Sequence, residues 1–179
     1  MKVSQKSAKR YAQSLFQLSQ EEKSIDSVYN NLQMINHLID QSQEFASFLQ
    51  NPTIPTEKRQ LILKEILENK LDALTYRFIL FLERKNRLAF LKNIFQTFEE
   101  LYFEAKGILK VTFTSRWALT SEEVQHISQH LKDKFHKDIV TQLRTDDTIL
   151  GGVKIQIGDF IYDFSLQTQL NKFKQSLLN

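Results

Sequence analysis

The first 106 residues place apolar and polar side chains with the period of amphipathic helices. Apolar residues recur three and four positions apart, so each series lies along one side of a helix. Six such series follow one another, at residues 8–16, 25–39, 45–49, 61–67, 71–82 and 88–102. The links between them are short, and Pro52 and Pro55 end the third series. This pattern predicts a six-helix bundle over residues 1–106.

The period changes at Gly107, the first glycine of the chain. Residues 108–114 alternate apolar and polar side chains, which is typical of a strand with one buried face. Thr120 and Glu123 have the spacing of a capping box at the start of a further helix. Residues 138–144 predict a second strand, and a last helix is expected from about Leu166. The chain is therefore expected to be mainly α, ending in a small α/β domain over residues 107–179.

The stretch LGGVKIQIGDFIYDFSLQTQL, residues 150–170, holds three of the four glycines of the chain. A phosphate-binding loop would need four residues between its glycines and a Lys after the second. Here Gly152 and Gly158 are separated by five residues, and Asp159 follows where Lys is required. An aspartate at that position would repel a phosphate, so the glycines do not indicate a nucleotide site.

A β-hairpin explains the same stretch better. If Gly158 and Asp159 form a two-residue turn, Ile157 faces Phe160 and Ile155 faces Tyr162. Val153 then faces Phe164, and all six apolar side chains lie on one face of the ribbon. A register that sorts six apolar residues onto one side is self-consistent, and we predict this hairpin.

The His, Asp and Cys residues give no strong signal of catalysis or metal binding. His126 and His130 are four apart on one helix face, a spacing that can hold zinc, but HISQH lacks the Glu of a metalloprotease motif. We expect both on the solvent face. Asp159 and Asp163 do not converge on one bond, and cysteine is absent. The sequence therefore predicts no catalytic residue, no metal site and no cofactor.

Charge leaves one alternative open. The net charge is +3 with a pI near 9.0, and the only single-sign block is Lys2, Lys6, Lys9 and Arg10, with no acid before Glu21. That block has features of a transit peptide, but we interpret it as the first helix of the mature protein. It also keeps open a basic helical RNA-binding protein as the alternative function. No run of 18 apolar residues is present, so no transmembrane helix is expected.

Four segments, in this order and spacing, carry a resemblance to a known family. They are RYAQSLFQLS (residues 10–19), LQNPTIPTEKRQLILKEI (49–66), FLERKNRLAFLKNIFQTFEELY (81–102) and ILGGVKIQIGDFIYDFSLQTQL (149–170). Together they resemble the delta subunit of F-type ATP synthases, the family of the mitochondrial oligomycin-sensitivity-conferring protein. Phe164, where the family usually has glycine, and Trp117, where a small residue is usual, depart from its pattern.

The resemblance implies a non-catalytic stator subunit that links the catalytic F1 head to the peripheral stalk. It implies that residues 1–106 receive the N-terminal helix of an alpha subunit, and that residues 107–179 meet the C-terminal ends of the b subunits. No nucleic acid partner is implied. The chain would be peripheral, at the cytoplasmic face of a bacterial inner membrane or the stromal side of a thylakoid membrane. Because the resemblance starts at Arg10, little room remains for a cleaved transit peptide.

Two sets of candidate contact residues follow. We expect the groove for the alpha subunit between the first and fifth helices, because Ala8 and Ala12 are small enough to let a partner helix approach. Its expected residues are Tyr11, Ala12, Leu15, Phe16, Leu74, Phe78 and Leu82. For the family motif and the region that contacts the b subunits, the expected residues are Gly151, Gly152, Gly158, Asp159, Asp163, Ser165 and Leu170.

Overall fold

The structure is a computed structural model that describes residues 2–158 and 160–178, with side chains from residue 6 to residue 175 apart from residue 159. The chain divides into two compact units, Met1–Tyr102 (unit 1) and Phe103–Asn179 (unit 2). The division falls slightly before the predicted boundary at Gly107. The expectation of a mainly helical chain with a small C-terminal sheet is confirmed.

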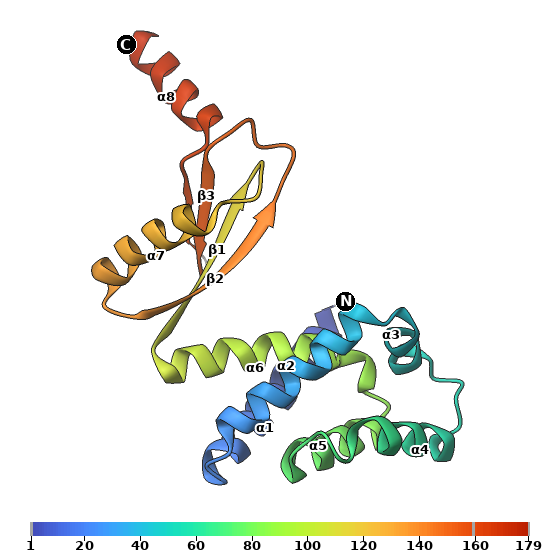
Figure 1. Ribbon diagram of the computed structural model, residues 1–179. Coiled ribbons are helices and arrows are strands. Elements are labelled where there is room, and N and C mark those ends of the chain that lie inside the picture. Colours follow the sequence, from blue (N-terminus) through green and yellow to red (C-terminus); the bar gives the residue numbers. More distant parts are fainter. Residues whose placement is uncertain (1, 159, 179) are drawn as a thin grey trace. The chain divides into compact units, whose positions relative to one another are not determined.

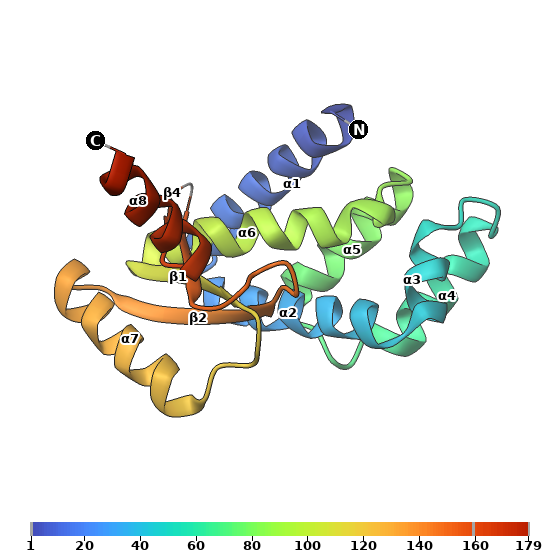
Figure 2. The ribbon, with the colours of Figure 1, turned by 90° about the horizontal axis from the view of Figure 1, so that it is seen from above.

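Unit 1 is built from helices alone within its described residues (Figures 1 and 2). They are α1 (Lys2–Glu21), α2 (Ile25–Gln41), α3 (Gln43–Gln50), α4 (Thr56–Leu67), α5 (Ala73–Arg84), the 3-10 turn η1 (Leu88–Phe90) and α6 (Leu91–Lys106). The sixth apolar series therefore begins as a 3-10 turn, and α6 runs on past the end of unit 1. Two helix starts have side-chain caps: Ser42 Oγ accepts from Phe45 N at 3.1 Å, and Asp72 Oδ1 from Thr75 N at 2.7 Å.

The core of unit 1 takes one stripe from each helix. Its largest fully buried side chains are Leu15, Leu32, Ile35, Leu63, Leu67, Ile79, Leu82, Leu88, Ile94 and Phe98. Each such side chain contributes about 1.5–3 kcal/mol of hydrophobic stabilisation relative to exposure. The periodic apolar side chains seen in the sequence thus pack together into one core.

A buried arginine joins two loops of unit 1. Arg59, in α4, is only 4% exposed. Its Nη2 donates to the carbonyl of Asn51 at 2.8 Å and to that of Ile54 at 3.3 Å, and its Nη1 donates to Asn86 Oδ1 at 3.3 Å. Arg59 therefore ties the proline-containing link before α4 to the turn after α5.

Unit 2 holds a four-stranded mixed sheet with strand order β2-β1-β3-β4. Its elements are β1 (Ile108–Ser115), α7 (Ser121–Phe135), β2 (Asp138–Thr145), β3 (Val153–Ile157), β4 (Phe160–Asp163) and α8 (Leu166–Leu178). β1 and β2 are parallel and joined through α7, whereas β1–β3 and β3–β4 are antiparallel. The capping box that opens α7 is confirmed, with both Thr120 and Glu123 bonds present.

Helix α7 covers one face of the central strands (Figures 1 and 2). Its apolar side chains pack on Val111, Phe113, Ile155 and Ile157, which form the buried core of unit 2. The helix and the sheet thus form two layers, as expected for a βαβ unit with an added hairpin. His126 and His130 on α7 are both exposed, as predicted, although His130 also lines a cavity with Leu131 and Ile155.

The predicted register of the β3–β4 hairpin is confirmed. Ile155 pairs with Tyr162 and Ile157 with Phe160, and the Phe164 N–H donates to the Val153 carbonyl at 3.0 Å just beyond β4. The β3 half of the apolar face is buried under α7, whereas Phe160 is 71% exposed. Phe160, at the start of β4, therefore lies beyond the cover that α7 provides, whereas Tyr162 lines a cavity with side chains of α7.

Candidate partner-binding site

An apolar groove of about 460 Å³ lies between α1 and α5 of unit 1. Its lining residues are Tyr11, Ser14, Leu15, Leu18 and Glu22 on the α1 side and Leu74, Arg77, Phe78 and Phe81 on the α5 side. Most of these side chains are apolar, and its volume lies within the range of ordinary ligand sites. A surface of this kind, between two helices, suits the apolar stripe of a third helix.

The helical period brings the two walls together. Along α1, Tyr11, Leu15 and Leu18 follow at intervals of four and three, so they share one side of the helix. The rings of Tyr11 and Phe81 meet edge to face, with centroids 6.1 Å apart. This contact between α1 and α5 marks one end of the groove.

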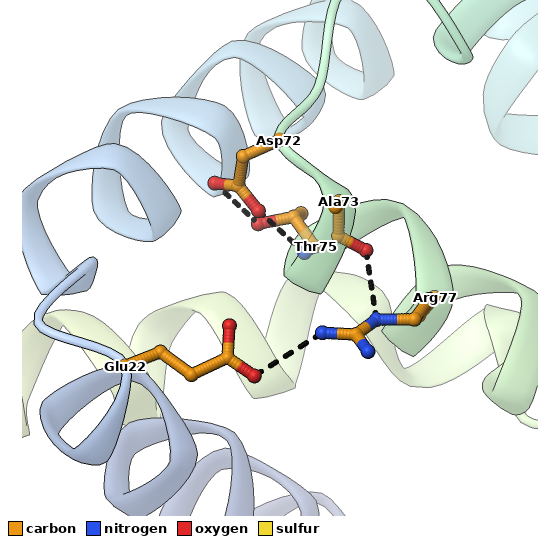
Figure 3. Close-up of polar contacts among 5 residues, drawn as sticks. All are labelled: Glu22, Asp72, Ala73, Thr75 and Arg77. Carbon is orange, nitrogen blue, oxygen red and sulfur yellow. Dashed lines mark hydrogen bonds and ion pairs between the residues drawn. The ribbon is translucent and has the colours of Figure 1, made fainter.

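The other end of the groove is closed by an ion pair (Figure 3). Arg77 Nη2 lies 3.1 Å from Glu22 Oε1, and its Nε donates to the Ala73 carbonyl at 3.2 Å. Both charged side chains are largely exposed, so the pair itself adds little stability. The ion pair does mean that Glu22 and Arg77, the charged residues that line this end, neutralise each other.

Four of the seven expected groove residues line the groove, and three do not. Tyr11, Leu15, Leu74 and Phe78 are among its lining residues. Ala12 and Leu82 are completely buried in the core of unit 1, and the Phe16 ring packs edge to face on Phe98, with centroids 5.7 Å apart. These three assignments were wrong as groove contacts.

The reason for the error is that small residues on α1 serve the packing of the chain's own helices. Ala8 and Ala12 are both buried in the unit 1 core, so neither leaves room for a partner. The sequence reasoning also missed Leu18 and Phe81, which are 45% and 43% exposed and form much of the open apolar surface. Their signal was present, because each continues the periodic row of its helix.

Of the glycine pair in unit 2, Gly152 is required by a close backbone approach. Gly152 has φ +81°, and a Cβ there would lie 2.4 Å from the Phe164 carbonyl oxygen and 3.1 Å from Ser165 Cα. At Gly151 a Cβ would meet the Leu166 side chain at 2.8 Å, and the Gly151 carbonyl accepts from Leu166 N at 3.0 Å. The pair therefore docks its loop onto the junction between β4 and α8.

Asp163 and Ser165 build the start of α8. Asp163 Oδ1 accepts from the Ser165 N–H at 2.8 Å, and Ser165 Oγ accepts from the Thr168 N–H at 3.4 Å. Hydrogen bonds from the Ser165 side chain and backbone hold the pKa of Asp163 below its ordinary value, with a smaller effect from Lys154. These polar motif residues fix the direction in which α8 leaves the sheet, and they do not form a catalytic pair.

The remaining expected residues of unit 2 lie in two places. Gly158 occupies the hairpin turn with φ +57°, and Asp159 lies outside the described residues. Leu170 is on α8, where it is 62% exposed and in line with the exposed Leu166 and Phe173. In Figures 1 and 2, α8 runs away from the sheet beyond β4 and does not pack on α7. About half or more of each side chain in this apolar stripe is exposed.

The two departures from the family pattern are accommodated without strain. Phe164 is not among the non-glycine residues with positive φ, and its half-exposed side chain lines a cavity with side chains of α7 and β3. Trp117 follows β1 and is 70% exposed; its carbonyl accepts from Ser115 Oγ at 2.6 Å, and the Arg116 guanidinium lies 5.3 Å from the Trp117 ring centroid. Both departures add exposed aromatic surface to unit 2.

Neither a metal site nor a membrane span is found over residues 2–158 and 160–178. Within these residues no group of three or more His, Asp or Glu side chains could hold a metal ion. The rings of His126 and His130 are in contact, with centroids 5.1 Å apart, but no third ligand from the described residues joins them. No helix in this part of the chain is both long and apolar enough to cross a membrane.

A family model described as ATP synthase delta (OSCP) subunit matches residues 8–177. The chain belongs to this family. An ATP synthase subunit delta of Acetivibrio thermocellus is 33% identical over 170 residues, covering 94% of this chain and 96% of the relative. That of Trichlorobacter lovleyi is 32% identical over 171 residues, covering 95% of each chain. The family resemblance noted in the sequence is thereby confirmed.

A solved structure shows the same fold. A chain in the cryo-EM structure of the Toxoplasma gondii mitochondrial ATP synthase hexamer matches with a TM-score of 0.77 and 22% identity. The match covers 96% of this chain and 97% of the other. The order of helical unit and small mixed sheet is therefore shared with that chain.

Proposed function

We propose that this chain is the non-catalytic stator subunit that joins the catalytic head of an F-type ATP synthase to its peripheral stalk. The observation that carries the proposal is the family match over residues 8–177. By holding the head against rotation, such a protein allows proton-driven rotation of the rotor to yield ATP synthesis. The chain would act as a peripheral protein at the cytoplasmic face of a bacterial inner membrane.

Unit 1, as a six-helix bundle, would bind the N-terminal helix of an alpha subunit in the groove between α1 and α5. The open apolar side chains of Leu18 and Phe81, over a floor that includes Leu15, support this assignment. A helix laid into the groove would bury them, as in other helix-in-groove complexes. The stator must hold the head under sideways load, and an apolar contact keeps its strength at cellular salt concentration.

Unit 2 would bind the C-terminal ends of the b subunits. Its exposed apolar residues are numerous for a small α/β unit: Trp117, Val140, Leu143, Leu150, Phe160, Ile161, Tyr162, Phe164, Leu166, Leu170 and Phe173. Large exposed apolar surface on a folded unit marks interaction sites. We assign the contact itself to these side chains, Leu170 included. The glycines, Asp163 and Ser165 position them.

The test for unit 1 is a calorimetric titration of the full chain with a synthetic peptide, the N-terminal segment of the alpha subunit from the same organism. Leu18→Glu and Phe81→Glu should each weaken binding at least about ten-fold, because a carboxylate would be buried against the peptide's apolar stripe. Leu61→Glu is the matched control, since Leu61 is an exposed leucine of α4 outside the groove. If the unaltered chain does not bind the peptide, the proposed function of unit 1 is wrong.

A further inference from the structure

Beyond the Tyr11–Phe81 end of the groove between α1 and α5, the chain carries four basic residues, two on α1 and two where α5 ends. Lys85 Nζ lies 6.0 Å from the Phe81 ring centroid, and Arg84 is the residue before it. On α1, Arg10 is four residues before the lining residue Ser14, and Lys6 is four before Arg10. Residues four apart stack along one side of a helix. We call Lys6, Arg10, Arg84 and Lys85 the basic end of the groove.

The basic end has no neutralising acid of its own. All four side chains are exposed, and among the described residues none of them forms an ion pair. The first acid of the chain is Glu21, at the far end of α1. Glu83, the one acid in α5, is buried and accepts from Gln60 Nε2 at 3.0 Å, so it is turned toward α4.

The two ends of the groove therefore differ in charge. At the far end, Arg77 and Glu22 are paired with each other at 3.1 Å. The last turn of α1 also carries no basic residue. An apolar stripe alone would fit the groove in either direction, whereas this charge difference distinguishes the two directions.

We propose that the groove accepts an amphipathic helix in one direction only, with carboxylates at one end of the occupant's apolar stripe lying against the basic end. The proposal rests on the proposed function, which makes the occupant the N-terminal helix of an alpha subunit. Apolar burial supplies most of the affinity, and the four cations select the direction. Charges at the rim of an interface act in this way, on orientation and association rate more than on affinity.

The first test compares two double variants of the full chain in titrations with the same alpha peptide. Arg84→Glu with Lys85→Glu reverses two charges of the basic end. Lys58→Glu with Lys70→Glu makes the same change of net charge at exposed positions of unit 1 outside the groove. At low salt we expect the first pair to weaken binding about ten-fold or more and the second to change it less than about three-fold. At about 0.5 M salt the difference should shrink.

The second test determines the direction in which the peptide helix lies in the groove. A spin label is attached to one or the other end of the peptide, and broadening of the chain's amide signals is recorded. The label at the acid-bearing end should broaden signals near Arg10 and Lys85, and the label at the opposite end should broaden those near Glu22 and Arg77. Broadening of both regions by each label, or the reversed pattern, would overturn the proposal.

The outcomes separate this inference from the proposed function. If the peptide does not bind the unaltered chain, the proposed function fails first. If it binds, but the two double variants weaken it equally, the groove has an occupant without a preferred direction and only this inference fails. If a random-sequence RNA oligonucleotide binds the unaltered chain at the same salt and is lost in Arg84→Glu with Lys85→Glu, the basic end is a nucleic acid site and the inference is likewise wrong.

Discussion

At the scale of single residues, Gly152 allows the loop before β3 to pack against the junction between β4 and α8. Its positive φ and its approach to the Phe164–Ser165 backbone both require the absence of a Cβ. Gly158 also has positive φ, but a Cβ there would meet no atom within 4 Å. Alanine at Gly158 therefore introduces backbone strain alone, whereas alanine at Gly152 introduces strain and steric overlap.

We expect Gly152→Ala to lower the free energy of unfolding of unit 2 by about 2–4 kcal/mol, since the strain of the left-handed conformation is joined by overlap with backbone atoms. Gly158→Ala should cost about 1 kcal/mol from strain alone. Trp117 is the only tryptophan and lies in unit 2, so its fluorescence in a urea titration reports this unit. Equal losses for the two variants would contradict the role given to the close approach.

Arg59 has a comparable role in unit 1. We expect Arg59→Met to lower its free energy of unfolding by about 2–4 kcal/mol, because two loop carbonyls and the Asn86 side chain lose their buried donor. Lys58→Met, at an exposed neighbouring position, should change it by less than about 0.5 kcal/mol. Urea unfolding followed by far-ultraviolet circular dichroism measures both. Similar midpoints for the two variants would mean that the loops do not depend on Arg59.

At the scale of elements, α8 is held at its base and leaves its apolar stripe for another surface to cover. Its first turn is fixed by Ser165 and by the Gly151 carbonyl, whereas the stripe stays exposed. We therefore expect Leu170→Glu with Phe173→Glu to leave the urea midpoint of unit 2 unchanged. On the proposed function, the same variant should weaken binding of a peptide from the C-terminal end of the b chain at least about ten-fold.

The matched control for α8 is Gln167→Glu with Asn171→Glu, which adds the same charge to exposed polar positions of the helix. It should leave binding of the b-chain peptide within about three-fold of the unaltered chain. A loss of equal size in both variants would show that added negative charge is responsible. No loss in either would remove the apolar stripe of α8 from the contact.

Local pattern predicted most elements of the fold but not their partners in space. The helical stripes and the hairpin register were readable because burial of one face fixes the period and the pairing. The strand order β2-β1-β3-β4 depends on pairing between distant segments, which no local pattern contains. Among groove residues, Ala12 and Leu82 were misassigned for a related reason. A periodic series shows which side of a helix is apolar, but not which part of that side neighbouring helices cover.

At the scale of the whole molecule, each unit has its own core and its own uncovered apolar surface. The groove of unit 1 is lined by α1 and α5, and the exposed apolar side chains of unit 2 lie on β2, β4, α8 and the loops of the unit. Because the two surfaces belong to different units, the proposed function has one chain hold two partners at once, one on each unit. That property is what a stator link requires, and it is the central claim of the proposed function.

The most direct measurement is a bridging experiment with the full chain. A peptide from the C-terminal end of the b chain is immobilised, and retention of the alpha/beta catalytic head is measured with and without the protein. We predict that the head is retained only when the protein is present. Leu18→Glu should lose the head while the protein stays bound, and Leu170→Glu with Phe173→Glu should lose both. Retention of the head without the protein, or displacement of one partner by the other, would contradict the account.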